Sequence, residues 1–100
     1  MLVATVAGEL DMTNAAYMRE ELTRAVPDRA HALVIDLTEA RYMDSAAIEV
    51  LFELSRRLVQ RRQQLRLVVP RRSPLRRLFT LIDLGSVAPL HDSLETAVAV

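Results

Sequence analysis

Residues 32–37 read Ala-Leu-Val-Ile-Asp-Leu, and this stretch decides the fold. The run is apolar except at Asp36 and lacks the alternation of polar and apolar residues that marks a strand with one face in water. A short continuous apolar run is typical of a strand that is covered on both faces, as in a parallel sheet flanked by helices. The segment therefore predicts a buried strand within a layered α/β domain.

The segments on either side alternate between two periodicities. Short apolar or β-branched runs predict further strands over 2–6, 65–69 and 87–90. Apolar residues spaced by three or four positions predict amphipathic helices over about 15–26, 45–62, 74–84 and 93–99. This order predicts the α/β class: a single layered domain over residues 1–100, with a largely parallel or mixed sheet of about four strands and about four helices.

Polar residues mark where each helix should begin. Thr13, Ser45 and Ser73 precede the first three helices and can accept a hydrogen bond from an unpaired backbone N–H. Asp92, followed three residues later by Glu95, resembles a capping box for the last helix.

The composition excludes several classes of protein. The 100 residues are 51% apolar, contain no Cys and only two Gly, and have a formal net charge of zero. A disordered chain, a disulfide framework, a thiolate metal site and a glycine-rich phosphate loop are therefore excluded. No apolar run is long enough to span a membrane and no secretion signal is evident, so we expect a cytoplasmic protein without membrane insertion.

The zero net charge hides a segregation of charge along the chain. Residues 1–53 sum to −6, and residues 54–100 sum to +6, since nine Arg lie between Arg56 and Arg77. Such a cluster can be a surface for nucleic acid or an anionic partner, or it can be a solvated helix face followed by a basic loop. We favour the second interpretation, without direct nucleic-acid binding, because no Lys and almost no aromatic residues accompany the arginines.

A site is expected where the parallel strands end. The carboxyl ends of parallel strands share one edge of a sheet, and binding loops gather there. Three loops, 8–13, 38–45 and 70–73, should meet at this edge and bring together Glu9, Asp11, Thr13, Asp44, Ser45, Arg71 and Arg72.

Catalysis is not expected at this edge. Neither His31 nor His91 is placed beside a serine nucleophile, and no His, Asp or Glu cluster has the spacing of metal ligands. Convergent acid, base and stabilising groups are missing from the pattern. The sequence therefore predicts a protein that is not an enzyme, with no catalytic residue, no metal and no cofactor.

Ser45 allows two interpretations. Its hydroxyl can cap the long helix, a common role that contributes about 1 kcal/mol. It can also be a modification site, because a phosphate of about −1.5 to −2 charges is tolerated at a helix N-terminus. From the residues alone we favour the cap, and the two roles are compatible.

Several segments together resemble a known family. Gly8-Glu9-Leu10-Asp11, Val34-Ile35-Asp36-Leu37-Thr38 and Tyr42-Met43-Asp44-Ser45 resemble a STAS domain, and among STAS domains the bacterial anti-sigma factor antagonists. The resemblance continues through 65–68 and 89–95 and so covers nearly the whole chain. It implies a switch that binds an anti-sigma factor, often also a serine kinase, and thereby frees a sigma factor for transcription.

The resemblance also implies the site residues. Phosphorylation of the Ser that follows the Asp ends the capture and a phosphatase restores it, so Ser45 is the expected phosphoacceptor. The residues expected to bind the partner are Asp11, Thr13, Asp44, Ser45, Ala46, Ala47 and Glu49. Phosphate would add bulk and negative charge to an acidic patch, so docking would be lost by repulsion and desolvation.

Three departures from the family pattern bear on these expectations. Ala46 and Ala47 stand where Ser-Gly usually follows the phosphoacceptor, and Ala47 adds a methyl group where close approach is normal. Asp83 stands where a Gly usually precedes Leu84, so the preceding helix can end differently. Many members begin with one more strand; an open sheet edge would predict weak self-association into a homodimer.

Two other functions remain alternatives. A STAS subunit of a lipid-transport ABC system is a structural partner of an ATPase and need not be phosphorylated; Asp44-Ser45-Ala46 is compatible with that group. A regulatory module for a nucleotide or small ligand has weaker support, because the Gly-poor loops offer no evident cradle.

Overall fold

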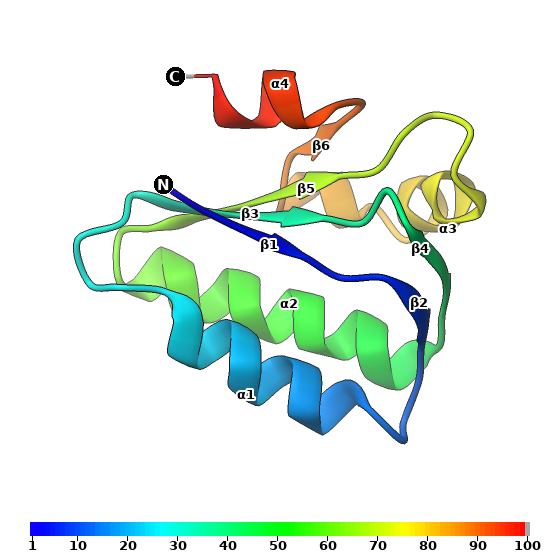
Figure 1. Ribbon diagram of the computed structural model, residues 1–100, viewed down its shortest axis with the longest axis horizontal. Coiled ribbons are helices and arrows are strands. Elements are labelled where there is room, and N and C mark those ends of the chain that lie inside the picture. Colours follow the sequence, from blue (N-terminus) through cyan, green and yellow to red (C-terminus); the bar gives the residue numbers. More distant parts are fainter. Residues whose placement is uncertain (100) are drawn as a thin grey trace.

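The apolar runs form one parallel sheet. In the computed structural model, which describes residues 1–99, β3 (Ala32–Asp36) lies between β1 (Leu2–Thr5) and β5 (Gln64–Val68) (Figure 1). The short strand β6 (Leu90–His91) completes the order β1-β3-β5-β6, and all three pairings are parallel. The predicted α/β class with a sheet of four strands is confirmed.

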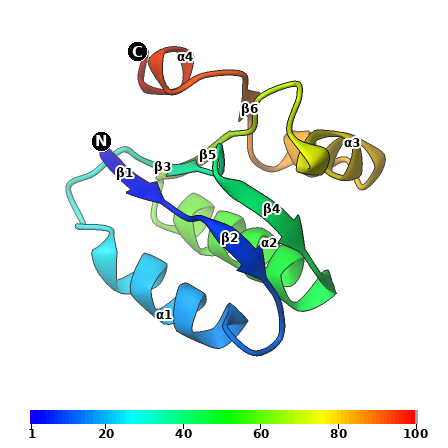
Figure 2. The same ribbon diagram turned by 45° about the vertical axis from the view of Figure 1, so that its right-hand side comes forward.

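Helices cover both faces of this sheet. α1 (Ala15–Ala25) and α2 (Ser45–Gln60) lie side by side on one face, and α3 (Pro74–Leu81) lies beyond the end of the sheet, next to β4 (Figures 1 and 2). The short helix α4 (Leu94–Val98) crosses the opposite face. No helix within residues 1–99 is both long enough and apolar enough to cross a membrane.

The burial of β3 explains why its sequence is apolar throughout. Leu33 and Ile35 are fully buried in the main core beneath α1 and α2. Val34 points to the other face, where it forms a small second cluster with Val68 and Ala97 of α4. Successive side chains of a strand point to opposite faces, so a strand between two layers needs apolar residues at every position.

Two further short strands lie where the sequence predicted loops. β2 (Gly8–Leu10) and β4 (Ala40–Met43) pair in parallel as a separate two-stranded sheet (Figure 2). The expectation of loops over 8–13 and 38–45 was wrong at these positions. Each strand is too short for its alternation to stand out; Leu10 and Met43 are buried, whereas the residues before them, Glu9 and Tyr42, are exposed.

The last third of the chain departs from the predicted boundaries. α3 ends at Leu81, and Asp83 adopts a left-handed backbone with φ of 57° before a 3-10 turn, η1 (Leu84–Ser86). The helix therefore ends three residues before the predicted boundary at 84, and Asp83 takes the left-handed position that usually favours glycine. The last strand is Leu90–His91, later than the predicted 87–90.

Of the four predicted helix caps, one is confirmed and three are displaced by one residue, Ser45 among them. The Ser73 hydroxyl accepts a hydrogen bond from Leu75 N at 3.1 Å, as predicted. The last helix is capped by Ser93, which accepts from Thr96 N, and Asp92 is not its cap. Thr13 does not cap α1, which begins at Ala15.

Candidate functional site

The site is built where β2 and β4 end side by side. The register places Leu10 opposite Met43, and the Asp44 N–H donates to the Leu10 carbonyl at 3.0 Å. The loop from β2 to α1 and the start of α2 are therefore neighbours. Two of the three loops predicted to share one edge do so.

Asp44 is the cap of α2. Its carboxylate oxygen Oδ1 accepts a hydrogen bond from Ala47 N at 3.0 Å. The interpretation of Ser45 as the cap was wrong by one residue, because Asp44 has the extended backbone that a cap needs and Ser45 is the first helical residue. The Ser45 hydroxyl is thereby left free of the capping role.

The same carboxylate also contacts the neighbouring loop. Oδ2 of Asp44 accepts a hydrogen bond from Met12 N at 2.9 Å, across 32 positions of sequence. Asp44 thus joins two segments with its two oxygens, holding the start of α2 with one and the tip of the β2–α1 loop with the other.

The β2–α1 loop is ordered by its own side chains. Thr13 donates to the Asp11 carboxylate both from its hydroxyl and, at 2.9 Å, from its backbone N–H. The Asn14 side chain accepts from Asp11 N and donates to the Glu9 carbonyl, each at 2.9 Å. The Thr13 hydroxyl and then its N–H lower the pKa of Asp11 below its ordinary value, because both stabilise the carboxylate.

The residues around Ser45 differ in accessibility. Ser45 and Glu49 are exposed, and Asp44 and Ala46 are half-buried. Ala47 is fully buried in the main core, so its side chain cannot touch a partner and we remove it from the predicted binding surface. Its methyl group points inward, and the expected crowding beside Ser45 does not arise from it.

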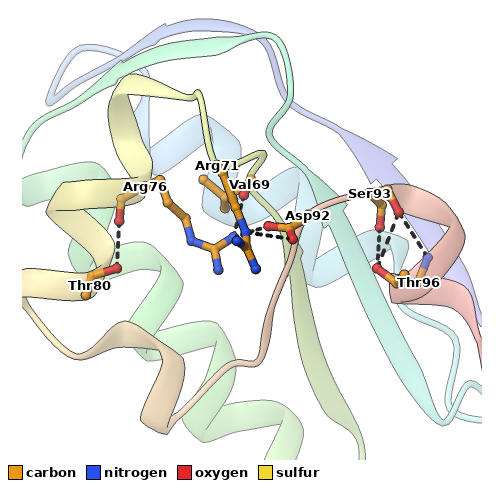
Figure 3. A network of polar contacts seen from close by, with 7 residues as sticks. All are labelled: Val69, Arg71, Arg76, Thr80, Asp92, Ser93 and Thr96. Atoms are coloured by element: carbon orange, nitrogen blue, oxygen red, sulfur yellow. Dashed lines mark hydrogen bonds and ion pairs between the residues drawn. The ribbon is translucent and has the colours of Figure 1, made fainter.

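The third predicted loop lies elsewhere. The segment from β5 to α3 is next to the beginning of β4, whereas α2 starts beyond the other end of β4 (Figures 1 and 2). Arg71 and Arg76 contact the two carboxylate oxygens of Asp92 at 3.1 and 3.0 Å (Figure 3). These arginines tie α3 to the segment after β6, and the expectation that Arg71 and Arg72 join the Ser45 site was wrong.

The basic residues of the second half are spread over several elements. Arg56 pairs with Glu49 at 3.3 Å on α2, and Arg61 pairs with Asp28 in the loop before β3. Together with the Asp92 contacts, this distribution favours the interpretation of solvated helix faces over one continuous basic surface.

Two apolar side chains near the site were not predicted. Met12 is 77% exposed at the tip of the β2–α1 loop, and Tyr42 is 52% exposed on β4, opposite Glu9. A single apolar residue in a loop forms no periodic pattern, so the sequence gives no signal for Met12. The exposure of Met12 follows from the turn that Asp11 and Thr13 form around it.

Comparison with known proteins agrees with this architecture. Residues 1–97 match the STAS domain family. The anti-sigma-F factor antagonist RsfB of Mycobacterium tuberculosis is 32% identical over 95 residues, which cover 95% of this chain and 76% of RsfB. BtrV of Bordetella bronchiseptica is 30% identical over 100 residues, which cover 99% of this chain and 84% of BtrV.

A solved structure shows the same fold. An anti-sigma factor antagonist from Mycobacterium paratuberculosis has a TM-score of 0.82 and 28% identity, covering 96% of this chain and 81% of the other. The parallel order of the strands, the match over residues 1–97 and the relatives just described lead to one conclusion. This chain belongs to the STAS domain family, among the relatives of the anti-sigma factor antagonists.

Proposed function

We propose that this protein is an anti-sigma factor antagonist that binds its partner while Ser45 is unmodified and releases it when Ser45 is phosphorylated. The observation that carries the proposal is the placement of Ser45: it is exposed at the first position of α2 and relieved of capping by Asp44. A kinase can approach such a hydroxyl without unfolding the helix. The role of the chain in this proposal is regulatory, not catalytic.

The surroundings of Ser45 indicate how a phosphate would end binding. Glu9 and Glu49 are exposed and Asp11 and Asp44 half-buried, on the segments that surround Ser45. A partner that recognises this surface must be complementary, with basic groups opposite the acids. A phosphate adds about −1.5 to −2 charges and bulk at the centre of the contact. Docking is then opposed by desolvation of the phosphate and by loss of shape complementarity.

The partners follow from the same proposal. An anti-sigma factor that is also a serine kinase would bind this surface and transfer phosphate to Ser45, and a phosphatase would reverse the transfer. The protein would act in the cytoplasm, where sigma factors and RNA polymerase are found, without contacting nucleic acid itself.

Direct phosphorylation tests the proposal. The protein is incubated with ATP and each anti-sigma kinase encoded near its gene, and the phosphate is located by mass spectrometry. We expect one phosphate at Ser45 and none in Ser45→Ala, whereas Ser86→Ala, which changes another exposed serine, should be modified like the wild type. Absence of transfer to Ser45 from every such kinase would refute the switch.

Binding of the variants tests the consequence. Ser45→Ala keeps an uncharged side chain and should retain the anti-sigma factor, whereas Ser45→Asp should lose it. Equal affinity of the two variants, measured by calorimetry, would contradict control by charge at this position. Neighbouring genes for a permease and an ATPase, in place of a kinase, would favour the lipid-transport alternative.

Self-association is a separate part of the proposal. β1 pairs with β3 on one side and with no other strand among residues 1–99. The strand carries no charged residue, Pro or Lys, the features that commonly protect an edge. We expect weak, concentration-dependent homodimers that Val3→Lys prevents. Sedimentation that shows only monomer at high concentration would refute this.

A further inference from the structure

The contact between Asp44 and Met12 links the modification site to a loop that lies 32 residues away in sequence. Asp44 immediately precedes Ser45, and its Oδ2 accepts from Met12 N at 2.9 Å. Met12 is the most exposed large apolar side chain among residues 1–99. The residue next to the expected phosphate therefore holds the loop tip that presents this side chain to solvent.

We propose that Asp44 couples the state of Ser45 to the β2–α1 loop, so that phosphorylation releases Met12 from Asp44 and changes the shape of the surface as well as its charge. This inference rests on the proposed phosphorylation of Ser45. Asp44 acts in it as a positioning residue, because it works through the loop and does not itself carry the phosphate.

The bond to Met12 is the weaker of the two that the Asp44 carboxylate makes. It is solvent-exposed, whereas the capping bond to Ala47 is half-buried and leads to a fully buried residue. A hydrogen bond exposed to water contributes little net free energy, so a modest change in the local field can open it. The buried side chain of Ala47 keeps the capping bond in place, so the hydrogen bond from Met12 N is the one that breaks.

A phosphate on Ser45 supplies that change in field. Consecutive Cα atoms are only about 3.8 Å apart, so a phosphate on Ser45 lies close to the Asp44 carboxylate. The two anions repel each other. The repulsion turns the Asp44 carboxylate about its capping bond, so that Oδ2 leaves Met12 N while Oδ1 stays with Ala47 N.

The loop would move as a unit and would not unfold. Thr13 and Asn14 hold Asp11 and Glu9 through hydrogen bonds made within the loop itself. Those contacts do not involve Asp44, so they survive its displacement. The expected change is therefore confined to the attachment of the loop tip at Met12, with Thr13 unaffected.

Amide hydrogen exchange followed by NMR tests the coupling on the protein alone. Phosphoserine is installed at position 45 during synthesis, so the result does not depend on whether a kinase acts there. We expect Met12 N–H to exchange about five- to tenfold faster than in the unmodified protein, the factor that corresponds to loss of one exposed hydrogen bond. The Thr13 N–H rate should stay unchanged.

Two variants separate the coupling from general effects of charge. In Asp44→Asn the side-chain oxygen can still cap Ala47, but the amide group cannot accept from Met12, so Met12 alone should exchange faster. Glu49→Gln removes a charge from the same surface without touching Met12 and should leave both rates unchanged. The coupling is overturned if phosphoserine at 45 leaves the Met12 rate as it was, or if Glu49→Gln alters it as much as Asp44→Asn does.

Discussion

The hydroxyl of Ser55 donates a hydrogen bond of 2.7 Å to the backbone carbonyl of Val87, which lies 32 residues further along the chain. Ser55 is buried in the middle of α2, and the carbonyl belongs to the segment between η1 and β6. A polar side chain on the buried face of an amphipathic helix needs such a partner. The contact fixes the last third of the chain against the long helix.

Replacing Ser55 tests how much this hydrogen bond contributes to the unfolding free energy. Ser55→Ala leaves the Val87 carbonyl, which is part-buried, without its side-chain donor, and an unsatisfied buried acceptor costs about 1–3 kcal/mol. We expect a loss of unfolding free energy in that range, measured by urea denaturation. Ser86→Ala removes an exposed local bond to the Asp83 carbonyl and should change stability by less than about 0.5 kcal/mol. Equal effects of the two changes would contradict the assignment.

Arg62 offers a stabilising change. It adopts a left-handed backbone with φ of 59° just after α2, where the N–H groups of Arg62 and Gln63 return to the Val59 and Leu58 carbonyls. This is the arrangement in which glycine is preferred. Arg62→Gly should raise the unfolding free energy by about 0.5–1 kcal/mol, because it removes the strain of a side chain in this region.

The same type of substitution within α2 should lower the unfolding free energy instead of raising it. Arg57 is an exposed residue of α2 with ordinary helical surroundings. Arg57 lies in the last turn of the helix, so Arg57→Gly should lower stability by up to about 1 kcal/mol, the cost of glycine in a helix interior. Both values come from denaturation curves, and a loss of stability in Arg62→Gly would show that its side chain contributes more than the strain costs.

The pKa of Asp11 reports on the β2–α1 loop. It is lowered in the folded protein, first by the Thr13 hydroxyl and then by the Thr13 N–H, so the ionised carboxylate stabilises the fold. This contribution is present above the unfolded pKa of about 3.9 and is lost as the pH falls through the lower folded value. Thr13→Val removes the hydroxyl and should move the pKa of Asp11 back toward its ordinary value.

Carbon NMR of the Asp11 carboxyl group measures this shift. The control is Thr38→Val, because Thr38 makes the same pair of contacts with Asp36 in another loop. We expect the pKa of Asp11 to stay lowered in that variant. An unchanged pKa of Asp11 in Thr13→Val would mean that the hydroxyl is not the main cause.

Met12 should contribute to partner binding if the proposed function is correct. An exposed, flexible apolar side chain on an ordered loop is suited to filling a pocket on a partner. Met12→Ala should weaken binding of the anti-sigma factor about tenfold or more, measured by calorimetry. Val59→Ala changes another exposed apolar residue, 64% exposed near the far end of α2, and should bind like the wild type. Unchanged affinity in Met12→Ala would exclude an anchoring role.

The parts of the fold that were predictable are those in which periodicity extends over many residues. The apolar run from Ala32 to Leu37 predicted the buried strand, and the stripe along α2 predicted a helix that differs from the observed one by two residues at its end. β2 and β4 escaped prediction because three or four residues carry too little pattern, and they are defined by pairing with each other across 32 or 33 positions.

The site was predictable only in part. Asp44 and Ser45 both favour a helix start, and choosing between two adjacent caps depends on backbone angles that composition does not fix. The bond from Met12 to Asp44 joins residues 32 positions apart and has no local signal. Arg71 was expected beside Ser45 because the loops at the ends of parallel strands commonly meet. The strand β4 separates them, since the β5–α3 loop lies next to its beginning and Ser45 follows its end.

Arg66 determines how the second face of the sheet is closed. Its guanidinium donates to the Ala97 and Ala99 carbonyls at 2.9 and 3.2 Å, which gives the end of α4 its hydrogen-bond donors. A helix of five residues cannot persist without such support. If the hydrogen bonds from Arg66 to α4 break, Val34 and Val68 lose the Ala97 methyl group that covers them. Detachment of α4 is therefore expected as an early step of local unfolding, before the main core opens.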